Sequence, residues 1–359
     1  MQGIAHSYIP NPQHKDDYAL KRLDLNWEDG GAYALLGPSG CGKTTLLNII
    51  SGLLDPSQGE ILFDEKKVNG LHTRERNIAQ VFQFPVIYDT MTVYENLAFP
   101  LKNRKVSERR INIRVQEIAE ILDITPDLNK RASGLNADIK QIISLGRGLV
   151  REDVSAILFD EPLTVIDPHV KWLIRRQLKQ IHEQLKLTMI YVTHDQLEAL
   201  TFADKVNVML DGAVLQQGTP QDLFEAPAHT YVGYFIGSPG MNILPCTIDN
   251  GHAIVEAEKI KIPAVMAKAG EKAKGPLKLG IRPEFTMVTS SNNSDATPIR
   301  IKKVETLGNY RIVTAMLGKV IIKIKVSEKV QVNPDANNKV IFNQDNMILY
   351  ENDKALNLQ

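Results

Sequence analysis

The sequence has little cysteine, no excess of either charge and no long apolar run. Two cysteines in 359 residues, Cys41 and Cys246, cannot build a disulfide framework and fit a reducing compartment. The 42 Lys and Arg residues balance the 42 Asp and Glu residues, which argues against a nucleic-acid-binding protein that relies on net positive charge. No run of about 18 apolar residues is present, so we expect no membrane-spanning helix. The first residues show no basic region followed by an apolar run, so no secretory signal is predicted and the default compartment is the cytoplasm.

Two domains are predicted from the length, because a domain holds roughly 150 residues. The first part of the chain alternates apolar strands with helical patterns, which is typical of a mostly parallel sheet with helices on its faces. We predict strands at 32–36, 155–159 and 189–192, helices at 45–53, 138–150 and 168–186, and a mainly helical stretch over 92–124.

The pattern changes at 237–245, where two prolines and two glycines in nine residues mark a linker. Beyond this linker, short apolar runs separated by polar turns predict a small β-barrel domain. The runs lie at 299–301, 311–313, 320–324 and 340–342, and the polar run Thr289–Pro298 predicts a surface loop.

A glycine-rich loop follows the predicted strand at 32–36. It matches the phosphate-binding pattern G-x-x-x-x-G-K-[ST], with a strand before it and a helix after it as that pattern requires. Its backbone N–H groups and the helix dipole would hold a β-phosphate, Lys43 would reach the β- and γ-phosphates, and Thr44 would ligate Mg²⁺. The loop consists of Gly37, Pro38, Ser39, Gly40, Cys41, Gly42, Lys43 and Thr44. Cys41 stands at a variable position, where a small residue lining the loop is a better interpretation than a redox role.

Two carboxylates end the apolar strand at 155–159. Asp160 can hold Mg²⁺ there, directly or through water. Glu161 is placed to polarise an attacking water as a general base. An Asp-Glu pair alone often marks only a solvated strand end, but the phosphate loop upstream favours the catalytic interpretation.

These motifs, in this order, resemble those of the ATP-binding-cassette (ABC) ATPases, and the resemblance covers nearly the whole chain. It rests on the loop Gly37–Thr45, on Gln83, on the acid pair with 162–167, and on His194. By this resemblance, Gln83 would contact Mg²⁺ and the attacking water, His194 would contact the γ-phosphate, and Asp167 would reach the nucleotide site of a second subunit.

The resemblance also implies how the site is completed. An aromatic side chain upstream of the loop would stack on the adenine ring, with Tyr8 favoured and Tyr18 second. ATP and Mg²⁺ are the implied cofactors. The implied catalytic set is Lys43, Gln83, Glu161 and His194, the nucleotide contacts include Thr45, and the metal ligands are Thr44, Gln83 and Asp160.

The C-terminal part of the chain resembles one group within this family. Segments 237–245, 279–284 and 304–309 look like the C-terminal barrel of the maltose-importer ATPase and its carbohydrate-importer relatives. Within that group, 137–141 and 161–169 are most similar to the ATPases of bacterial glycerol importers. The family's role for this barrel in dimer contacts and regulation stands beside a purely structural role.

The implied fold class is therefore α/β, a P-loop ABC ATPase domain over 1–236 with a helical subdomain at about 88–150. An all-β, OB-like (TOBE) regulatory domain would follow over 237–359.

The chain departs from the family at the Leu-Ser-Gly-Gly-Gln motif, which caps the γ-phosphate bound to the other subunit. Aligning the following helix puts Leu135-Asn136-Ala137-Asp138-Ile139 in its place, and a second register would use 132–136. We favour the first, because a three-residue slip rotates the helix by most of a turn. Asn136 could then offer an amide donor, and Ala137 would add a Cβ near phosphate. Asp138 would either bring a carboxylate near the polyphosphate, where like charges repel unless Mg²⁺, Lys or the helix dipole offsets them, or cap the helix and face away from nucleotide. We favour the cap.

The implied function is the ATP-hydrolysing subunit of an importer for a polyol or sugar-type solute, glycerol or a glycerol phosphate. Its partners would be two membrane-spanning permease subunits, contacted at Gln83 and along a groove at 84–92, and, through them, an extracytoplasmic solute-binding protein. The divergent motif favours a second, different ATPase subunit, and a homodimer remains open. We expect no nucleic-acid partner and a place at the cytoplasmic face of the inner membrane. The alternatives are an importer ATPase for another carbohydrate, a soluble single-cassette ABC ATPase, and a regulatory module that does not hydrolyse ATP.

Overall fold

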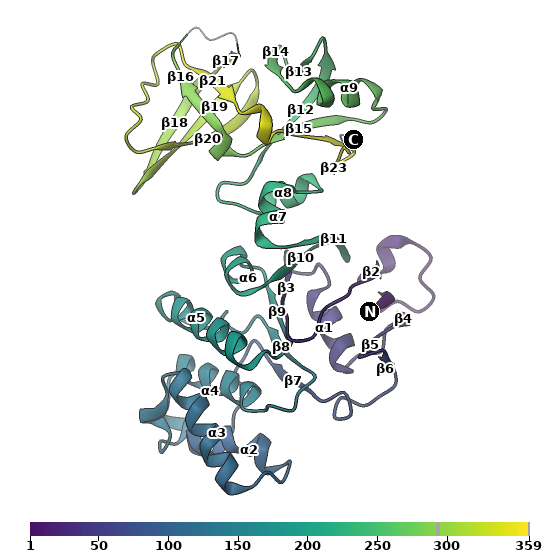
Figure 1. The fold of residues 1–359 in the computed structure, drawn as a ribbon, viewed down its shortest axis with the longest axis vertical. Helices are drawn as coiled ribbons and strands as arrows, with labels where there is room; N and C mark the ends of the chain where they lie inside the picture. The colour runs from purple at the N-terminus through teal and green to yellow at the C-terminus, as the bar shows by residue number, and fades with distance from the viewer. Residues whose placement is uncertain (292–294, 358–359) are drawn as a thin grey trace. The chain divides into compact units, whose positions relative to one another are not determined.

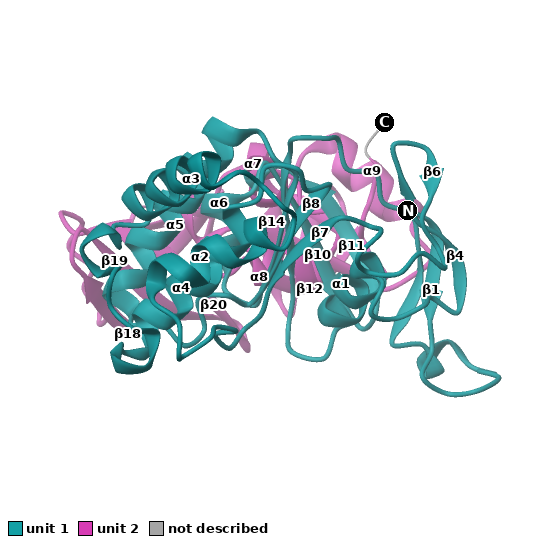
Figure 2. Ribbon diagram, turned by 90° about the horizontal axis from the view of Figure 1, so that it is seen from below, with its two compact units in different colours: residues 1–220 teal, residues 221–359 magenta. Residues whose placement is uncertain are grey.

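The computed structural model describes residues 1–291 and 295–357. Its contacts divide the chain into two compact units, Met1–Pro220 and Gln221–Gln359 (Figures 1 and 2). Within the described residues, no helix is both long and apolar enough to cross a membrane.

A six-stranded sheet forms the centre of the first unit. Its order is β11 (Ala213–Gly218), β10 (Lys205–Leu210), β3 (Ala32–Leu36), β9 (Met189–Thr193), β8 (Ala156–Asp160) and β7 (Ile78–Val81). All neighbours are parallel except β11, which runs antiparallel to β10. The central strands β3 and β9 are buried along their whole length, because helices cover both faces of the sheet. Figure 1 shows α1 (Lys43–Ser51) on one side and α5 (Pro168–Leu185) with α6 (Gln196–Phe202) on the other.

Three helices occupy the range where a helical subdomain is predicted. They are α2 (Val93–Lys102), α3 (Glu108–Ile121) and α4 (Ala137–Leu149). A capping box between Thr92 and Glu95 begins α2. The prediction of a mainly helical stretch over 92–124 is correct in kind, but the chain leaves the helix at 103–107, where Lys105 has a positive φ of 57°.

A smaller antiparallel sheet completes the first unit. It joins β2 (Leu20–Leu23), β1 (Gln2–His6) and β4 (Gln58–Glu60), and β5 (Leu62–Phe63) pairs with β6 (Lys66–Lys67) beside it. Ile4 and Leu20 of this sheet pack in one core with Leu46 and Leu47 of α1, so the sheet is held against the helix that follows the glycine loop.

The second unit is built mainly from antiparallel strands. One sheet has the order β14 (Glu258–Lys261), β13 (His252–Val255), β12 (Asn242–Asp249), β15 (Leu277–Ile281), β22 (Ile348–Glu351) and β23 (Lys354–Ala355). A second has β16 (Thr286–Thr289), β21 (Lys339–Phe342) and β17 (Ala296–Pro298), and a third β18 (Arg300–Leu307), β19 (Tyr310–Leu317) and β20 (Val320–Ser327). The helices are α7 (Pro220–Glu225), α8 (Thr230–Phe235) and α9 (Ala264–Lys272). Short 3-10 turns lie at Lys15–Asp17, Thr125–Asp127, Ala132–Gly134, Pro283–Phe285 and Gln344–Asn346.

The predicted surface loop Thr289–Pro298 is wrong at its carboxyl end. Residues 296–298 form β17, which pairs with β21 and buries Thr297. The prediction failed because a short strand with polar residues has no clear apolar alternation. Residues 292–294 of that prediction lie outside the described residues.

A buried arginine connects α7 and α8 to the β-domain. Arg282 is 1% exposed and lies over the ring of Phe224. Its guanidinium donates to carbonyl oxygens near the ends of both helices: Leu223 and Phe224 in α7, Gly233 in α8, and Ile236, which caps α8. Burial lowers its pKa to about 10, which leaves it charged at neutral pH. The two helices thus belong structurally to the second unit, and the sequence boundary at 236/237 stays a prediction.

Candidate functional site

The glycine loop connects β3 to α1 and is shaped by positions where a side chain does not fit. Gly42 is the N-cap of α1 with φ of 98°, and a Cβ there would lie 2.7 Å from the carbonyl oxygen of Ala19. A Cβ on Gly37 would lie 2.3 Å from the carbonyl oxygen of Met209. Gly40, with φ of 81°, has open space in front of it. The loop therefore exposes backbone N–H groups at the start of a helix, where anions bind.

Lys43 lies beneath this loop with only 4% of its surface exposed. Its Nζ donates to the carbonyl oxygens of Gly37 and Pro38, each at 2.9 Å. The ammonium is thus held against the loop that would carry a phosphate. Cys41 is buried beside it, and burial raises the pKa of its thiol, which agrees with a packing role for this side chain.

Asp160, at the carboxyl end of β8, faces the first turn of α1. The Thr44 hydroxyl donates to Asp160 Oδ1 at 3.3 Å, across 116 positions of sequence. Burial raises the pKa of the Asp160 carboxyl, and the Thr44 hydrogen bond and Lys43 oppose that rise. A cation beside this carboxylate would favour its ionised form.

Glu161 is held in an unusual backbone conformation. Its φ is 47°, a left-handed value that is uncommon for a side-chain-bearing residue, and its N–H donates to Val192 of β9 at 2.9 Å. Its Oε2 lies 3.0 Å from His194 Nδ1 and accepts from the Thr164 hydroxyl at 3.4 Å. Glu161 follows β8 and His194 follows β9, so the carboxyl ends of these neighbouring strands bring the carboxylate and the imidazole together.

These residues surround a cavity of about 460 Å³. Besides the loop, α1 and the acid pair, it is lined by Tyr8, Ala19 and Gln83. The hydroxyl of Tyr8 lies 3.2 Å from Thr45 Oγ1, and the residue is 62% exposed. Tyr18 does not line this cavity, and its hydroxyl accepts from Gln58 Nε2 at 3.1 Å. The lining residues are Tyr8, Ala19, Ser39, Gly40, Gly42, Lys43, Thr44, Thr45, Gln83, Asp160 and Glu161.

Eight predicted site residues do not line this cavity: Gly37, Pro38, Cys41, His194, Asn136, Ala137, Asp138 and Asp167. The first three belong to the glycine loop itself, and His194 contacts the lining residue Glu161. Asp138 and Asp167 instead meet each other, because Asp138 Oδ1 accepts from the Asp167 backbone N–H at 3.3 Å. Asp167 also caps α5, accepting from the N–H of His169 at 2.9 Å. That residues 136–138 and Asp167 serve a nucleotide on another subunit stays a prediction.

The expectation that Asp138 caps the helix is wrong. The N-cap is Asn136, whose side-chain oxygen accepts from the Ile139 backbone N–H at 2.9 Å, and α4 begins at Ala137. Asn and Asp are equally good N-caps, so residue type alone could not decide between positions 136 and 138. Asp138 lies in the first turn, where the helix dipole favours its charge.

Sequence reasoning gave no role to Gln141, which ties three predicted segments together. It is fully buried on α4, and its Nε2 donates to the carbonyl oxygens of Phe82 at 3.1 Å and Pro162 at 2.8 Å. It therefore holds the residue before Gln83 beside the residue after Glu161. A glutamine on the buried face of an amphipathic helix was the available signal.

Glu198 was missed as well. It is 4% exposed and accepts from the hydroxyls of Tyr191 and Thr193, two alternate residues at the end of β9, just before His194. The signal in the sequence was an acid four residues after His194 on a short helix.

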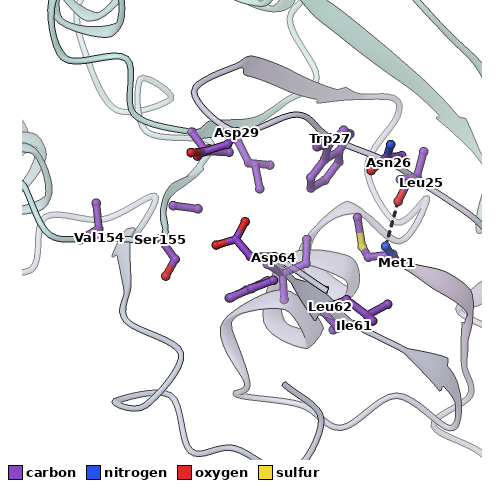
Figure 3. A pocket seen from close by; sticks show the side chains of 15 residues that line it. Met1, Leu25, Asn26, Trp27, Asp29, Ile61, Leu62, Asp64, Val154 and Ser155 are labelled. Atoms are coloured by element: carbon purple, nitrogen blue, oxygen red, sulfur yellow. Dashed lines mark hydrogen bonds between the residues drawn. The ribbon is translucent and has the colours of Figure 1, made fainter. Parts of the chain in front are cut away.

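A second cavity, of about 300 Å³, lies at the opposite ends of the strands (Figure 3). Val154, Ser155 and Ala156 line it just where β8 begins, and Thr188 lines it just before β9. Figure 3 shows the amino group of Met1 beside the Leu25 carbonyl, to which it donates at 2.9 Å. Ligands of open α/β sheets bind at the carboxyl ends of the strands, so the cavity beside the glycine loop is the candidate site.

The arrangement at that edge is suited to a polyphosphate. The loop supplies N–H groups and the Lys43 ammonium supplies positive charge, while Thr44 and Asp160 supply oxygen ligands. Next to these groups, Glu161 supplies a carboxylate that can act as a base, and His194, paired with it, supplies a polar side chain. Such a set can bind a nucleoside triphosphate and direct water at its last phosphate.

Comparison with known proteins gives matches to both parts of the chain. The family model described as ABC transporter matches residues 20–164, and the model described as MalK OB fold domain matches residues 237–285. The sn-glycerol-3-phosphate import ATP-binding protein UgpC of Bordetella avium is 37% identical over 308 residues, which cover 86% of this chain and 84% of that protein. The putative uncharacterized ABC transporter ATP-binding protein YcjV of Escherichia coli is 40% identical over 287 residues, or 79% of each chain.

Among solved structures, cbiO1 of Clostridium perfringens, part of an ABC transporter complex, matches with a TM-score of 0.56 and 30% identity. The match covers 63% of this chain and 89% of that chain. Together with the OB fold match, it confirms the predicted fold class, an α/β cassette followed by an all-β domain.

Proposed function

This chain belongs to the family of ABC transporter ATP-binding proteins and is an importer ATPase, and from that premise we propose that it powers the uptake of glycerol or a glycerol phosphate. The premise confirms the family resemblance of the sequence. The finer statement, the solute, rests on the relatives named for sn-glycerol-3-phosphate import and on the similarity of 137–141 and 161–169 to glycerol-importer ATPases.

Hydrolysis is assigned to the residues around the loop cavity. Lys43 would exchange its bonds to the loop carbonyls for the β- and γ-phosphates, which carry more negative charge. Glu161 would accept the proton of the attacking water, with Gln83 orienting that water and His194 contacting the γ-phosphate. Tyr8 would stack on the adenine ring, a role supported by its exposed side chain beside Thr45. The pairing of Glu161 with His194 at 3.0 Å is the observation that carries this assignment.

The donor atoms at the loop fit Mg²⁺. Thr44 and Asp160 present oxygen atoms 3.3 Å apart and Gln83 lines the same cavity, and Mg²⁺ prefers oxygen ligands. Mg²⁺ would neutralise charge developing on the phosphates. Within the described residues, no group of three or more His, Cys, Asp and Glu side chains is arranged to hold a metal, so phosphate and water oxygens would complete the shell.

The proposed membrane partner would meet the segment after Gln83. Phe84, Val86 and Tyr88 are 67%, 51% and 41% exposed, an apolar surface that suits a helix of a permease subunit. We place the subunit at the cytoplasmic face of the inner membrane through this contact, with a solute-binding protein on the far side of the permease.

Solute identity is tested by ATP hydrolysis in vesicles that hold the full transporter with its binding protein. We expect sn-glycerol-3-phosphate or glycerol to raise the rate, with maltose inactive. Stimulation by another sugar alone would contradict the glycerol proposal in favour of another carbohydrate. A rate that no solute changes would favour an ABC ATPase that is not coupled to transport.

The second ATPase subunit is proposed to be a different chain. The segment 135–139 offers Asn136, Ala137 and Asp138 where the family offers a small, hydroxyl-bearing motif, so two copies of this chain would pair two divergent sites. We expect the chain purified alone to hydrolyse ATP slowly and without cooperativity. Addition of the partner ATPase should restore fast, cooperative turnover in the same phosphate-release assay. Robust cooperative turnover of the chain alone would instead establish a homodimer.

A further inference from the structure

A buried carboxylate that the proposed chemistry does not use lies directly behind the catalytic edge. Glu198, in the first turn of α6, is 4% exposed. Its Oε2 accepts from the Thr193 hydroxyl at 2.7 Å and from the Tyr191 hydroxyl at 3.2 Å. Its Oε1 lies 3.9 Å from Lys171 Nζ. A buried carboxylate is costly unless such donors compensate it, so its position calls for an explanation.

His194 needs support from outside its own ring. The side chain is 53% exposed, so packing does not fix its orientation, yet its Nδ1 meets Glu161 at 3.0 Å. Apart from the contact with Glu161, the position of the imidazole depends on the backbone on both sides of it. On one side Thr193 donates to Glu198, and on the other the Asp195 N–H donates to the Thr193 hydroxyl at 3.0 Å.

The support closes into a ring of hydrogen bonds around His194. Asp195 caps α6 by accepting from Leu197 and Glu198 backbone N–H groups at 2.7 and 3.3 Å. Glu198 in turn holds Thr193. The segment 193–195, which contains His194, is therefore attached to α6 at two points. Burial raises the pKa of the Tyr191 phenol well above its usual range, which keeps the proton that Tyr191 donates to Glu198.

We propose that Glu198 is a positioning residue for ATP hydrolysis, which acts through Thr193 to hold His194 against Glu161. This inference rests on the proposed role of His194. The contact with Lys171 extends the same carboxylate to α5, where the Lys171 N–H donates to the Asp167 carbonyl at 3.0 Å, at the residue expected to face the second subunit. The Glu198 carboxylate thus holds Thr193, the residue before His194. It also contacts Lys171 in the first turn of α5, which follows Asp167.

The test is a double-mutant cycle on kcat for ATP hydrolysis, measured on the full chain with the subunits it needs for turnover. We expect His194→Ala to lower kcat by about a hundredfold. Glu198→Ala should lower kcat by about tenfold or more, with the KM for ATP changed by less than about twofold, since the loop, Lys43 and Tyr8 are untouched. In the double variant, Glu198→Ala should cost nothing beyond His194→Ala, because its effect passes through that side chain.

Two controls separate positioning from a general loss of structure. Glu198→Gln keeps an oxygen that can accept both hydroxyls, so it should recover most of the kcat lost in Glu198→Ala. Glu183→Ala removes an exposed acid of α5 and should leave kcat unchanged. If Glu198→Ala does not fold, Thr193→Val, which removes the donor to Glu198, takes its place in the cycle with His194→Ala.

Each outcome decides the inference. Additive losses in the double variant, or a Glu198→Ala effect on KM alone, would overturn the positioning role and leave the proposed function standing. An unchanged kcat in His194→Ala would overturn the role of His194 itself, and the inference with it. Coupled losses with recovery in Glu198→Gln would establish it.

Discussion

Glu161→Gln is expected to lower kcat for ATP hydrolysis by about a thousandfold while ATP still binds. The amide keeps the size of the side chain and can keep the contact with His194, but it cannot accept the proton of the attacking water. The loop, Lys43 and Thr44 remain as they are, so nucleotide affinity should hold. Phosphate release and titration with a fluorescent ATP analogue, on the same preparation, measure the two quantities separately.

The matched control for that substitution is Glu183→Gln, the same chemical change at an exposed position of α5. It should hydrolyse ATP at the wild-type rate. Hydrolysis by Glu161→Gln at the wild-type rate would disprove the general-base assignment, and it would support a base elsewhere at this edge of the sheet.

Lys43→Ala is expected to weaken ATP binding by roughly tenfold to a hundredfold, the range for losing a hydrogen bond to a charged group, and to lower hydrolysis at least as much. Lys43 Nζ is the buried cation of the loop, already held against the Gly37 and Pro38 carbonyls. Without it the loop offers only N–H groups and the helix dipole to three phosphates. Equilibrium titration with the fluorescent analogue gives the affinity, and a thermal melt checks that the loop change leaves the fold intact.

Lys66→Ala provides the comparison, since it removes an exposed ammonium from the β5–β6 hairpin, away from the loop cavity. Its affinity should equal that of the wild type. Equal affinity in Lys43→Ala would mean that nucleotide does not bind at this loop.

The fold was predictable where the pattern is local. The strand at β8 is apolar on both faces, and the loop at 37–44 matches a spaced pattern, so neither needs tertiary information. The break between α2 and α3 was not predictable, because Lys105 adopts a positive φ that its residue type does not favour. The strand 296–298 was missed because its partner β21 lies some forty positions further along the chain.

The site was predictable as a set of motifs and not as a geometry. Residue spacing placed Asp160 after a strand, but only the fold brings Thr44 to 3.3 Å from it across 116 positions. The N-cap of α4 is Asn136 because its side chain reaches the free backbone N–H of Ile139. Which N–H groups are free depends on where the helix begins, and the sequence alone does not show that. Gln141 and Glu198 carry no motif of their own, and they acquire meaning only from the segments that they join.

The most direct test of the account is ATP-driven accumulation of labelled sn-glycerol-3-phosphate or glycerol by vesicles that hold the full transporter. With the wild-type chain, solute should accumulate only when ATP and Mg²⁺ are present, and phosphate should be released as it does. With Glu161→Gln, accumulation and phosphate release should both cease, although the nucleotide stays bound. Continued accumulation with Glu161→Gln, or ATP hydrolysis by the wild type that never moves either solute, would contradict the claim that this chain drives their import.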